Sequence, residues 1–371
     1  MKNRIHSIDI VRGLIMVIMT LDHTRDFLHF PGPSPTNMEA TTVVLFFTRW
    51  ITHFCAPTFV FLAGVSAVLA GQRRSTAELH SFLLKRGAWL IASDLLFISL
   101  VFTLDPTYPV QVLEVLWATG FGMILLAALL RVPLKIIAAI AVVILLGHSY
   151  LPIPFLTMPA SMLPFSKTRF IFELYPALPW ASVLLLGYVV GHLYRDTFAA
   201  AKRRQILMRA GLICCLLFVV LRLINHFGDP APWSVQRNAA HTLLSFLNTT
   251  KQAPSLLFFL MTLGPVMILL AVAEKLQGRF VQILQVYGNV PYFYFIVHLT
   301  LLRIINLLLI PILGLPYHAT DDPLVWQAAG FGIPLWQVYI FWPLTVAALY
   351  YPCKLFGNYK RTHPHWWLSY L

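Results

Sequence analysis

The stretch Arg12-Gly-Leu-Ile-Met-Val-Ile-Met-Thr-Leu-Asp-His-Thr-Arg25 decides the fold, because an apolar run long enough to enter a bilayer ends in ionisable residues. A charged side chain at membrane depth costs about 2.5–3.5 kcal/mol on insertion scales, so such residues are rare and mostly functional. On a helix, Asp22 shares a face with Arg25 and Asp26, and His23 shares one with Asp26. The stretch predicts a proton-handling site at the end of a first membrane span. The alternative is a group solvated at the membrane surface.

The composition predicts the fold class. Hydrophobic residues make up 58% of the 371 residues and charged residues only 11%, a balance that excludes an ordinary soluble domain. Repeated apolar runs near twenty residues are typical of transmembrane helices. We therefore expect an all-α fold, a polytopic transmembrane helix bundle of about ten spans, forming a single integral-membrane domain over residues 1–371. The expected spans cover about 8–28, 42–70, 88–103, 112–130, 136–150, 176–191, 210–226, 255–273, 290–313 and 333–351.

The basic residues predict the orientation. Of the 27 lysines and arginines, 19 fall at the N-terminus, in alternate loops between the expected spans and in the C-terminal tail. By the positive-inside rule, both termini are cytoplasmic and the number of spans is even. The net charge of +13 therefore suits the head groups of a lipid bilayer rather than nucleic acid. Two longer outer segments, 151–175 and 228–252, are either substrate-facing lids or plain surface loops.

Two later spans also carry polar residues. In the second span, Arg49 and His53 are four residues apart and so lie on one helical face. We expect Arg49 to pair with Asp22 or Asp26, as part of a site or as a purely structural ion pair. In the ninth span, His298 precedes Arg303 and Asn306.

Absent motifs narrow the function. The sequence has no phosphate-cradling Walker loop, no dinucleotide-binding glycine pattern after a strand and no paired His–Glu metal signature on one helix. These absences argue against an ATP-driven pump and a metalloprotease. The four cysteines show neither a disulfide framework nor zinc spacing, so no metal is expected.

Several short motifs, taken in order, resemble one family. They are Arg4-x-x-Ser7-Ile-Asp9-Ile-Val-Arg12-Gly13, Phe59-Val-Phe-Leu-Ala-Gly64, Leu178-Pro-Trp180 with Leu186-Gly187-Tyr188, Asn248-Thr-Thr-Lys251-Gln-Ala-Pro254-Ser255-Leu256, Gly288-Asn-Val-Pro291 to His298, and Trp366-Trp-Leu-Ser-Tyr-Leu371. Together they resemble the catalytic-domain family of heparan-alpha-glucosaminide N-acetyltransferase, in its bacterial branch. That family belongs to a wider group of transmembrane acyltransferases.

The resemblance implies a reaction and a place for it. It implies transfer of an acyl group from cytoplasmic acetyl-CoA, or another acyl-CoA, to an acceptor on the opposite side of a bacterial cytoplasmic membrane. The acceptor would be a sugar, a glycan or another small molecule. A histidine near the end of the first span is central to the family's chemistry, and both His23 and His29 are candidates here.

These implications suggest roles for the candidate residues. His23 would act as general base or as a transient acyl carrier, Asp22 or Asp26 would orient it, and Arg25 or Arg49 would stabilise the oxyanion. His53 and His298 are further candidates. His23 lies eleven positions after Arg12, about 16 Å along a helix, a distance that an extended pantetheine arm would bridge. The basic residues expected to bind the phosphates of coenzyme A are Arg12, Arg73, Arg74, Lys85 and Arg86.

Two other function classes fit the same pattern. Intramembrane aspartate, histidine and arginine clusters are also typical of a proton-coupled secondary transporter of a small solute. In a structural or lipid-organising protein, the buried charges would serve stability alone. The sequence leaves open the identity of the acceptor, the acyl chain and whether the protein forms an oligomer.

Overall fold

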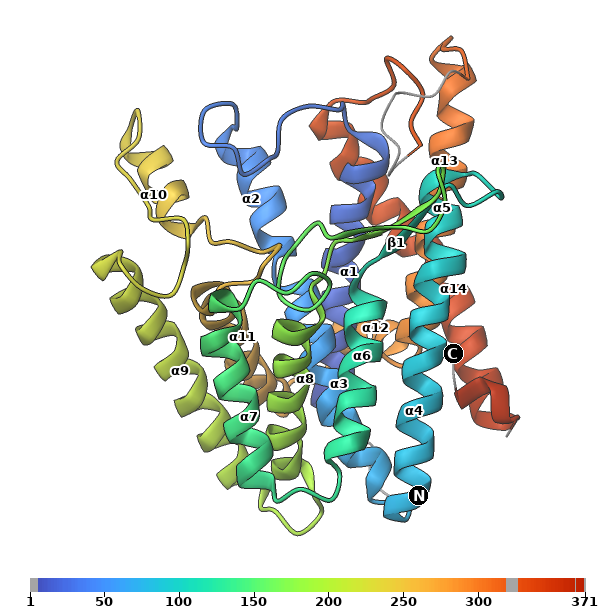
Figure 1. Cartoon of the computed structure of the whole chain (residues 1–371). Coiled ribbons are helices and arrows are strands. Elements are labelled where there is room, and N and C mark those ends of the chain that lie inside the picture. Colours follow the sequence, from blue (N-terminus) through green and yellow to red (C-terminus); the bar gives the residue numbers. More distant parts are fainter. Residues whose placement is uncertain (1–5, 318–325, 364, 370–371) are drawn as a thin grey trace. The chain divides into compact units, whose positions relative to one another are not determined.

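The computed structural model describes residues 6–317, 326–363 and 365–369 of the chain (Figure 1). Arg4 of the first motif, and Tyr370 and Leu371 of the last, lie outside the described residues. The contacts between residues group the chain into two compact units. Unit 1 comprises Met1–Cys55, Trp233–Asn248 and Val272–Leu371, and unit 2 comprises Ala56–Pro232 and Thr249–Ala271.

The described residues are mainly helical, as expected. Each of the ten predicted segments contains a helix, and six helical stretches within the described residues are long and apolar enough to cross a membrane. Two shorter apolar helices, Val115–Leu129 and Leu134–Tyr150, match the fourth and fifth predicted spans. The total number of crossings and the cytoplasmic location of both termini stay predictions. The six stretches are Val43–Gly71, Thr76–Thr103, Ala177–Tyr194, Ala200–Ile224, Leu256–Ala273 and Pro291–Ile312.

Unit 1 is organised around its first helix, α1 (His6–Leu28), which packs against four other helices of the unit that Figure 1 labels. These are α2 (Val43–Thr52), α12 (Arg279–Gly288), α13 (Pro291–Ile312) and α14 (Leu335–Thr362). A short 3₁₀ turn at Trp366–Ser369 follows α14.

Two glycines let α1 and α12 approach each other at backbone distance. A Cβ atom placed on Gly13 would lie 1.9 Å from the carbonyl oxygen of Leu284, and one on Gly288 would lie 1.9 Å from the carbonyl oxygen of Asp9. No real Cβ fits at such a distance, so any side chain at either position would push the helices apart. This contact fixes α1 relative to α12 and, through the short link to α13, relative to the helix that carries His298.

Part of the outer segment 228–252 is an ordered helix, α10 (Ala239–Leu247), which begins at the N-cap residue Asn238. It packs against α2. On either side of it, Arg237 donates to the carbonyl of Thr41 over 3.3 Å, and Asn248 donates to the carbonyl of Thr36 over 3.1 Å. These contacts hold the loop that leads into α2, the helix that carries Arg49.

Unit 2 contains the remaining long helices. The helix α4 (Thr76–Ser93) begins twelve residues before the start of the third predicted span, because Ser75 and Glu78 form a capping box at its N-terminus. A π-helical turn at Asp94–Ile98 interrupts the same span. The helices are α3 (Cys55–Gly71), α4 (Thr76–Ser93), α5 (Ser99–Thr103), α6 (Val115–Leu129), α7 (Leu134–Gly147), α8 (Ala177–Gly191), α9 (Ala200–Ile224) and α11 (Leu256–Ala273).

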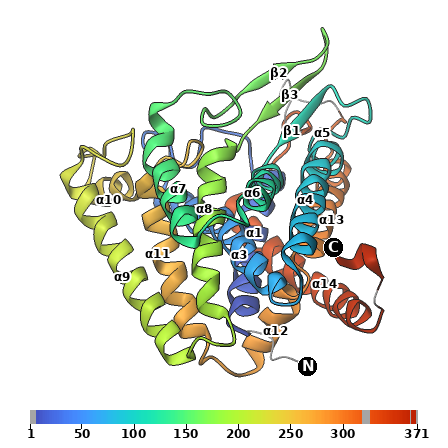
Figure 2. The same ribbon diagram turned by 60° about the horizontal axis from the view of Figure 1, so that its bottom comes forward.

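A small sheet in unit 2 corrects the expectation of an all-α fold (Figure 2). Its strands are β1 (Val110–Leu113), β2 (Met162–Pro164) and β3 (Phe170–Glu173), in the order β1-β3-β2. The strands β1 and β3 pair in parallel, with Val110 opposite Phe170, and β2 pairs with β3 in the antiparallel sense. Strands of three or four residues are too short to produce a recognisable alternation, which is why the sequence pattern did not predict them.

The last residue of β3 is a buried acid outside the predicted spans. Glu173 is fully buried. Burial penalises the charged carboxylate and raises the pKa of Glu173 to about 8, so the side chain is mostly protonated at neutral pH.

Candidate functional site

The last turns of α1 meet α2 through a partly buried network of four charges. Arg49 donates from Nη1 to Oδ2 of Asp22 over 2.5 Å, which confirms the predicted pairing between the first two spans. Arg25 contacts the other oxygen of Asp22 over 2.7 Å and reaches Asp26 over 2.5 Å. Asp22 thus lies between two guanidinium groups, and the two acids and two arginines balance in charge.

Burial differs within this network. Asp22 and Arg25 are only 7% and 6% exposed, whereas the side chain of Asp26 is 48% exposed. Nη1 of Arg25 is buried and has no hydrogen-bond partner among the described residues. Because buried polar groups nearly always have a partner, this unsatisfied guanidinium donor is an unusual feature of the network.

His23 contacts His298, 275 residues away in the sequence. Nδ1 of His23 lies 2.6 Å from Nε2 of His298, and the two rings stack with their centres 4.9 Å apart. His298 is fully buried, and its Nδ1 lies 2.9 Å from the carbonyl oxygen of Tyr294. The structure therefore brings together two of the predicted histidines, one from α1 and one from α13.

The hydrogen bonds assign the tautomers of both rings. A carbonyl oxygen only accepts, so Nδ1 of His298 carries the proton and Nε2 of neutral His298 is an acceptor. Nδ1 of His23 must then donate to that atom. Neutral His23 consequently keeps its lone pair on Nε2, which makes this atom the basic and nucleophilic nitrogen of the pair.

A second polar contact positions α13 against α1. The hydroxyl of Tyr294 lies 2.6 Å from that of Thr20, and the Tyr294 ring stacks on His298 with centres 5.4 Å apart. About two helical turns beyond His298, Asn306 donates to the carbonyl of Phe27 over 2.8 Å. Contacts on both sides of the histidine pair therefore fix the register between α1 and α13.

A groove of about 620 Å³ lies between α12 and α14 and borders α1. Its inner wall includes Tyr287, whose ring packs edge-on against Tyr294 with centres 5.3 Å apart. Two tyrosine side chains, Tyr287 and Tyr294, therefore connect the wall of the groove to His298. The groove is mainly apolar, with Val17, Trp342 and Tyr350 in its walls and Arg279 and Gln282 among its polar residues.

The contacts described for the histidine pair do not include the other predicted residues of unit 1. Nδ1 of His29 donates to the carbonyl of Ile333 over 2.9 Å, in the segment that leads into α14. His53 is buried at the break between α2 and α3. The guanidinium of Arg12 lies 3.6 Å from the carboxylate of Asp9 and 3.4 Å from the carbonyl of Gly288, so it also holds α1 against α12.

The four remaining basic residues expected to bind coenzyme A belong to unit 2, at the turn between α3 and α4 and in the middle of α4. Arg74 donates to the carbonyl of Ala70 over 3.2 Å and stacks on Phe82. The four are Arg73, Arg74, Lys85 and Arg86.

Sequence reasoning missed two residues that shape this site, Tyr294 and Tyr287. The signal for Tyr294 was its spacing of four residues from His298, which places its carbonyl within reach of the imidazole. Tyr287 carried no comparable signal, because its role depends on how α12 and α13 fold back on each other.

The region of the chain that contains α1 and α2 matches a known protein family. Residues 4–220 match the model of a family described as "Heparan-alpha-glucosaminide N-acetyltransferase, catalytic". The chain belongs to this family. The match covers more than half of the 371 residues and includes Asp22, His23 and Arg49. No curated protein matches the sequence.

Membership of the heparan-alpha-glucosaminide N-acetyltransferase catalytic family implies an acetyltransferase, and the apolar helices fit an integral membrane protein. The family uses acetyl-CoA as its donor. His298 lies beyond the matched residues. The sequence named His298 as a candidate, and its contact with His23 comes from the structure.

Proposed function

We propose that the protein transfers an acetyl group from cytoplasmic acetyl-CoA to a hydroxyl or amine of a sugar or glycan on the opposite side of a bacterial cytoplasmic membrane. The observation that carries this proposal is the His23–His298 pair beside the Asp22–Arg49 ion pair. Family membership supports acetyl transfer, and the predicted orientation places the donor on the side of the basic loops.

His23 acts as the general base in this proposal. Its Nε2 takes the proton of the acceptor as the acceptor oxygen or nitrogen attacks the thioester carbonyl. The new bond forms to the acetyl carbon, the carbon–sulfur bond breaks, and the departing thiolate of coenzyme A takes the proton from His23. His298 holds the His23 ring in the tautomer that leaves Nε2 basic, the role that a carboxylate plays beside other catalytic histidines.

The arginines stabilise the negative charge that develops on the acetyl oxygen. Nη1 of Arg25 is a buried donor that Asp22 and Asp26 do not occupy, because both acids contact Nη2. A charged donor at such a buried position is worth more than the same donor in water. Asp22 keeps Arg25 and Arg49 in place and compensates their charge.

The aromatic groove beside α1 suits the apolar part of acetyl-CoA. Its residues Tyr287, Trp342 and Tyr350 offer faces for the pantetheine chain, and Arg279 offers a cation for a phosphate. Arg279 follows one of the basic loops that the orientation places in the cytoplasm. Arg12, Arg73, Arg74, Lys85 and Arg86 stay further candidates for the phosphates.

Steady-state kinetics of variants tests the proposal. We expect His23→Ala to fold and to lower kcat for acetyl transfer by about 10²–10⁴-fold, the contribution typical of a general base. His29→Ala is the matched control, since it removes a histidine of the same helix end that bonds to the Ile333 carbonyl, and its kcat should stay within about threefold. Equal kcat values for His23→Ala and the unmodified protein would remove His23 from the mechanism. An acetylated His23 trapped before the acceptor is added would replace the general-base role with a covalent one.

A further inference from the structure

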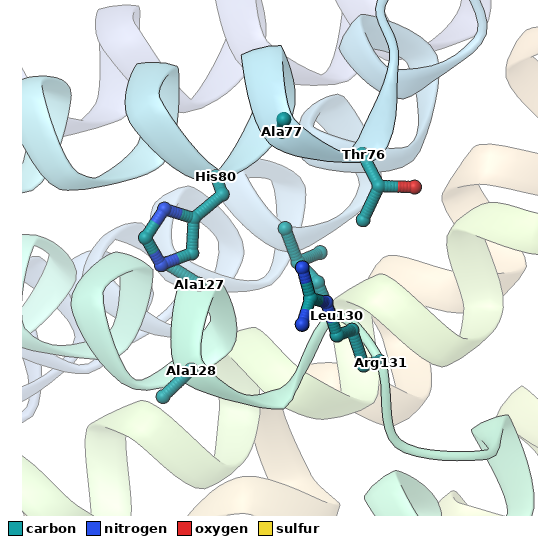
Figure 3. A pocket seen from close by; sticks show the side chains of 7 residues that line it. All are labelled: Thr76, Ala77, His80, Ala127, Ala128, Leu130 and Arg131. Atoms are coloured by element: carbon teal, nitrogen blue, oxygen red, sulfur yellow. The ribbon is translucent and has the colours of Figure 1, made fainter.

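A second pocket, of about 340 Å³ and open to the surface, lies in unit 2 between the start of α4 and the end of α6. His80 extends from α4 and Arg131 follows α6, and both side chains enter the gap between the two helices (Figure 3). Thr76 lies in the first turn of α4. The rest of the lining includes three alanines, Ala77, Ala127 and Ala128.

The gap follows from the way the two helices pack. A Cβ atom on Gly87 would lie 2.6 Å from the carbonyl oxygen of Gly120, so the backbones touch at that point. Ala77 lies ten residues before Gly87, and Ala127 lies seven residues after Gly120, which is about 15 Å and 10 Å along the helices. The helices are free to separate toward these ends, and small side chains leave the space between them open.

The pocket offers hydrogen-bond donors and positive charge. Arg131 contributes a guanidinium, His80 an imidazole and Thr76 a hydroxyl, and none of the described residues that line the pocket is acidic. The nearest acid in the sequence, Glu78, is engaged at the start of the helix, where its carboxylate accepts from the backbone N–H of Ser75 over 2.7 Å and from the Ser75 hydroxyl over 3.0 Å.

We propose that this pocket binds a phosphate group through Arg131, His80 and Thr76. The planar guanidinium matches two phosphate oxygens at once, and the imidazole and the hydroxyl can donate to the others. The volume exceeds that of a single phosphate ion, so the group would be attached to a larger molecule. Both an anionic phospholipid and a soluble phosphorylated molecule offer this chemistry.

The surrounding charges favour a negatively charged ligand. The pocket follows Arg73 and Arg74 in the sequence, on the side where the basic loops gather. Positive charge on that side of a membrane attracts anionic head groups as well as soluble phosphates. The site needs no acetyl transfer, so its test is independent of the proposed function.

Binding to the purified full-length protein tests the proposal in two arms. The first measures inorganic phosphate by equilibrium dialysis in detergent. The second measures retention of phosphatidylglycerol by native mass spectrometry, after reconstitution in bilayers of phosphatidylglycerol and phosphatidylcholine. We expect Arg131→Ala to weaken binding about tenfold or more in one arm, the effect of losing one hydrogen bond between charged groups. Weaker binding of inorganic phosphate by Arg131→Ala identifies a soluble ligand. Weaker retention of phosphatidylglycerol alone identifies a lipid.

Three further variants make the result specific. Ala77→Leu fills the pocket without changing its charge and should weaken binding as His80→Ala does. Lys135→Ala removes an exposed cation just after the pocket in the sequence and should leave binding unchanged. Binding that is insensitive to Arg131→Ala and Ala77→Leu in both arms would overturn the proposal, as would an equal loss in Lys135→Ala, which would indicate general surface charge.

Discussion

Replacing Asp22 by asparagine should destabilise the protein far more than the same change at Asp26. Asp22 is 7% exposed and contacts two guanidinium groups, over 2.7 Å to Arg25 and 2.5 Å to Arg49. Removing one partner of a buried ion pair costs about 3–5 kcal/mol, because the remaining charge stays buried without compensation. In this variant Arg25 still pairs with Asp26, and solvent reaches the side chain of Arg49, which is 23% exposed. We therefore expect a loss at the lower end of this range, about 3 kcal/mol.

Asp26 is the matched control for this prediction. Its side chain is 48% exposed, and exposed ion pairs contribute about 0.2–1 kcal/mol. The assay is the free energy of unfolding from a reversible titration of the purified protein with sodium dodecyl sulfate in mixed micelles. A double-mutant cycle of Asp22→Asn with Arg49→Gln should give a coupling energy above about 1 kcal/mol. Equal losses for Asp22→Asn and Asp26→Asn, together with no coupling, would refute the assignment of a buried ion pair.

Three further predictions concern the histidine pair, the sheet and the helix contact. His298→Leu should lower kcat about 10²-fold or more, because His23 loses the acceptor that sets its tautomer. His298→Gln restores an acceptor and should recover part of the rate. Equal pH–rate profiles in the two variants would argue against this role of His298. Because the pKa of Glu173 is raised to about 8, thermal stability should fall as the pH rises from about 4.5 to 8, and Glu173→Gln should remove that dependence in a series of melting curves. Gly13→Ala should lower the free energy of unfolding by about 1–3 kcal/mol, because the added methyl group overpacks the contact with α12. At Gly357 a Cβ would meet its nearest neighbour at 3.6 Å, so Gly357→Ala should be neutral or stabilising in the same detergent titration.

The energetics of burial made part of the site predictable. A charge at membrane depth needs a partner, and that requirement predicted a pair between Arg49 and either Asp22 or Asp26. The structure contains the pair with Asp22. The helices of the ten predicted segments followed from the length of the apolar runs in the same way. Both predictions depend on local properties of the chain, which a single sequence records directly.

The contact between His23 and His298 was not predictable by the same reasoning. His298 stood out as a polar residue in an apolar helix, but nothing in the spacing joined it to α1 rather than to another helix. That choice depends on backbone contacts such as Gly13 with Leu284, which bring α12 and α13 against α1. The sheet escaped prediction for a related reason, because β1 and β3 are short and pair across 56 intervening residues.

His23 and His29 were both candidates for the central histidine, and the sequence analysis gave the proposed role to His23 without excluding His29. Both lie at the end of α1 or just after it. The structure ties His29 to the carbonyl of Ile333 and places His23 against a second imidazole, so the two differ in the chemistry that their partners permit.

The most direct test of the central claim measures release of free coenzyme A from acetyl-CoA by the protein in sealed proteoliposomes, without any ion gradient. The proposed reaction predicts release that requires a sugar acceptor and disappears in folded His23→Ala protein. Uptake of a solute driven by a proton gradient, with no coenzyme A released in the presence of acceptors, would contradict it and favour a transporter.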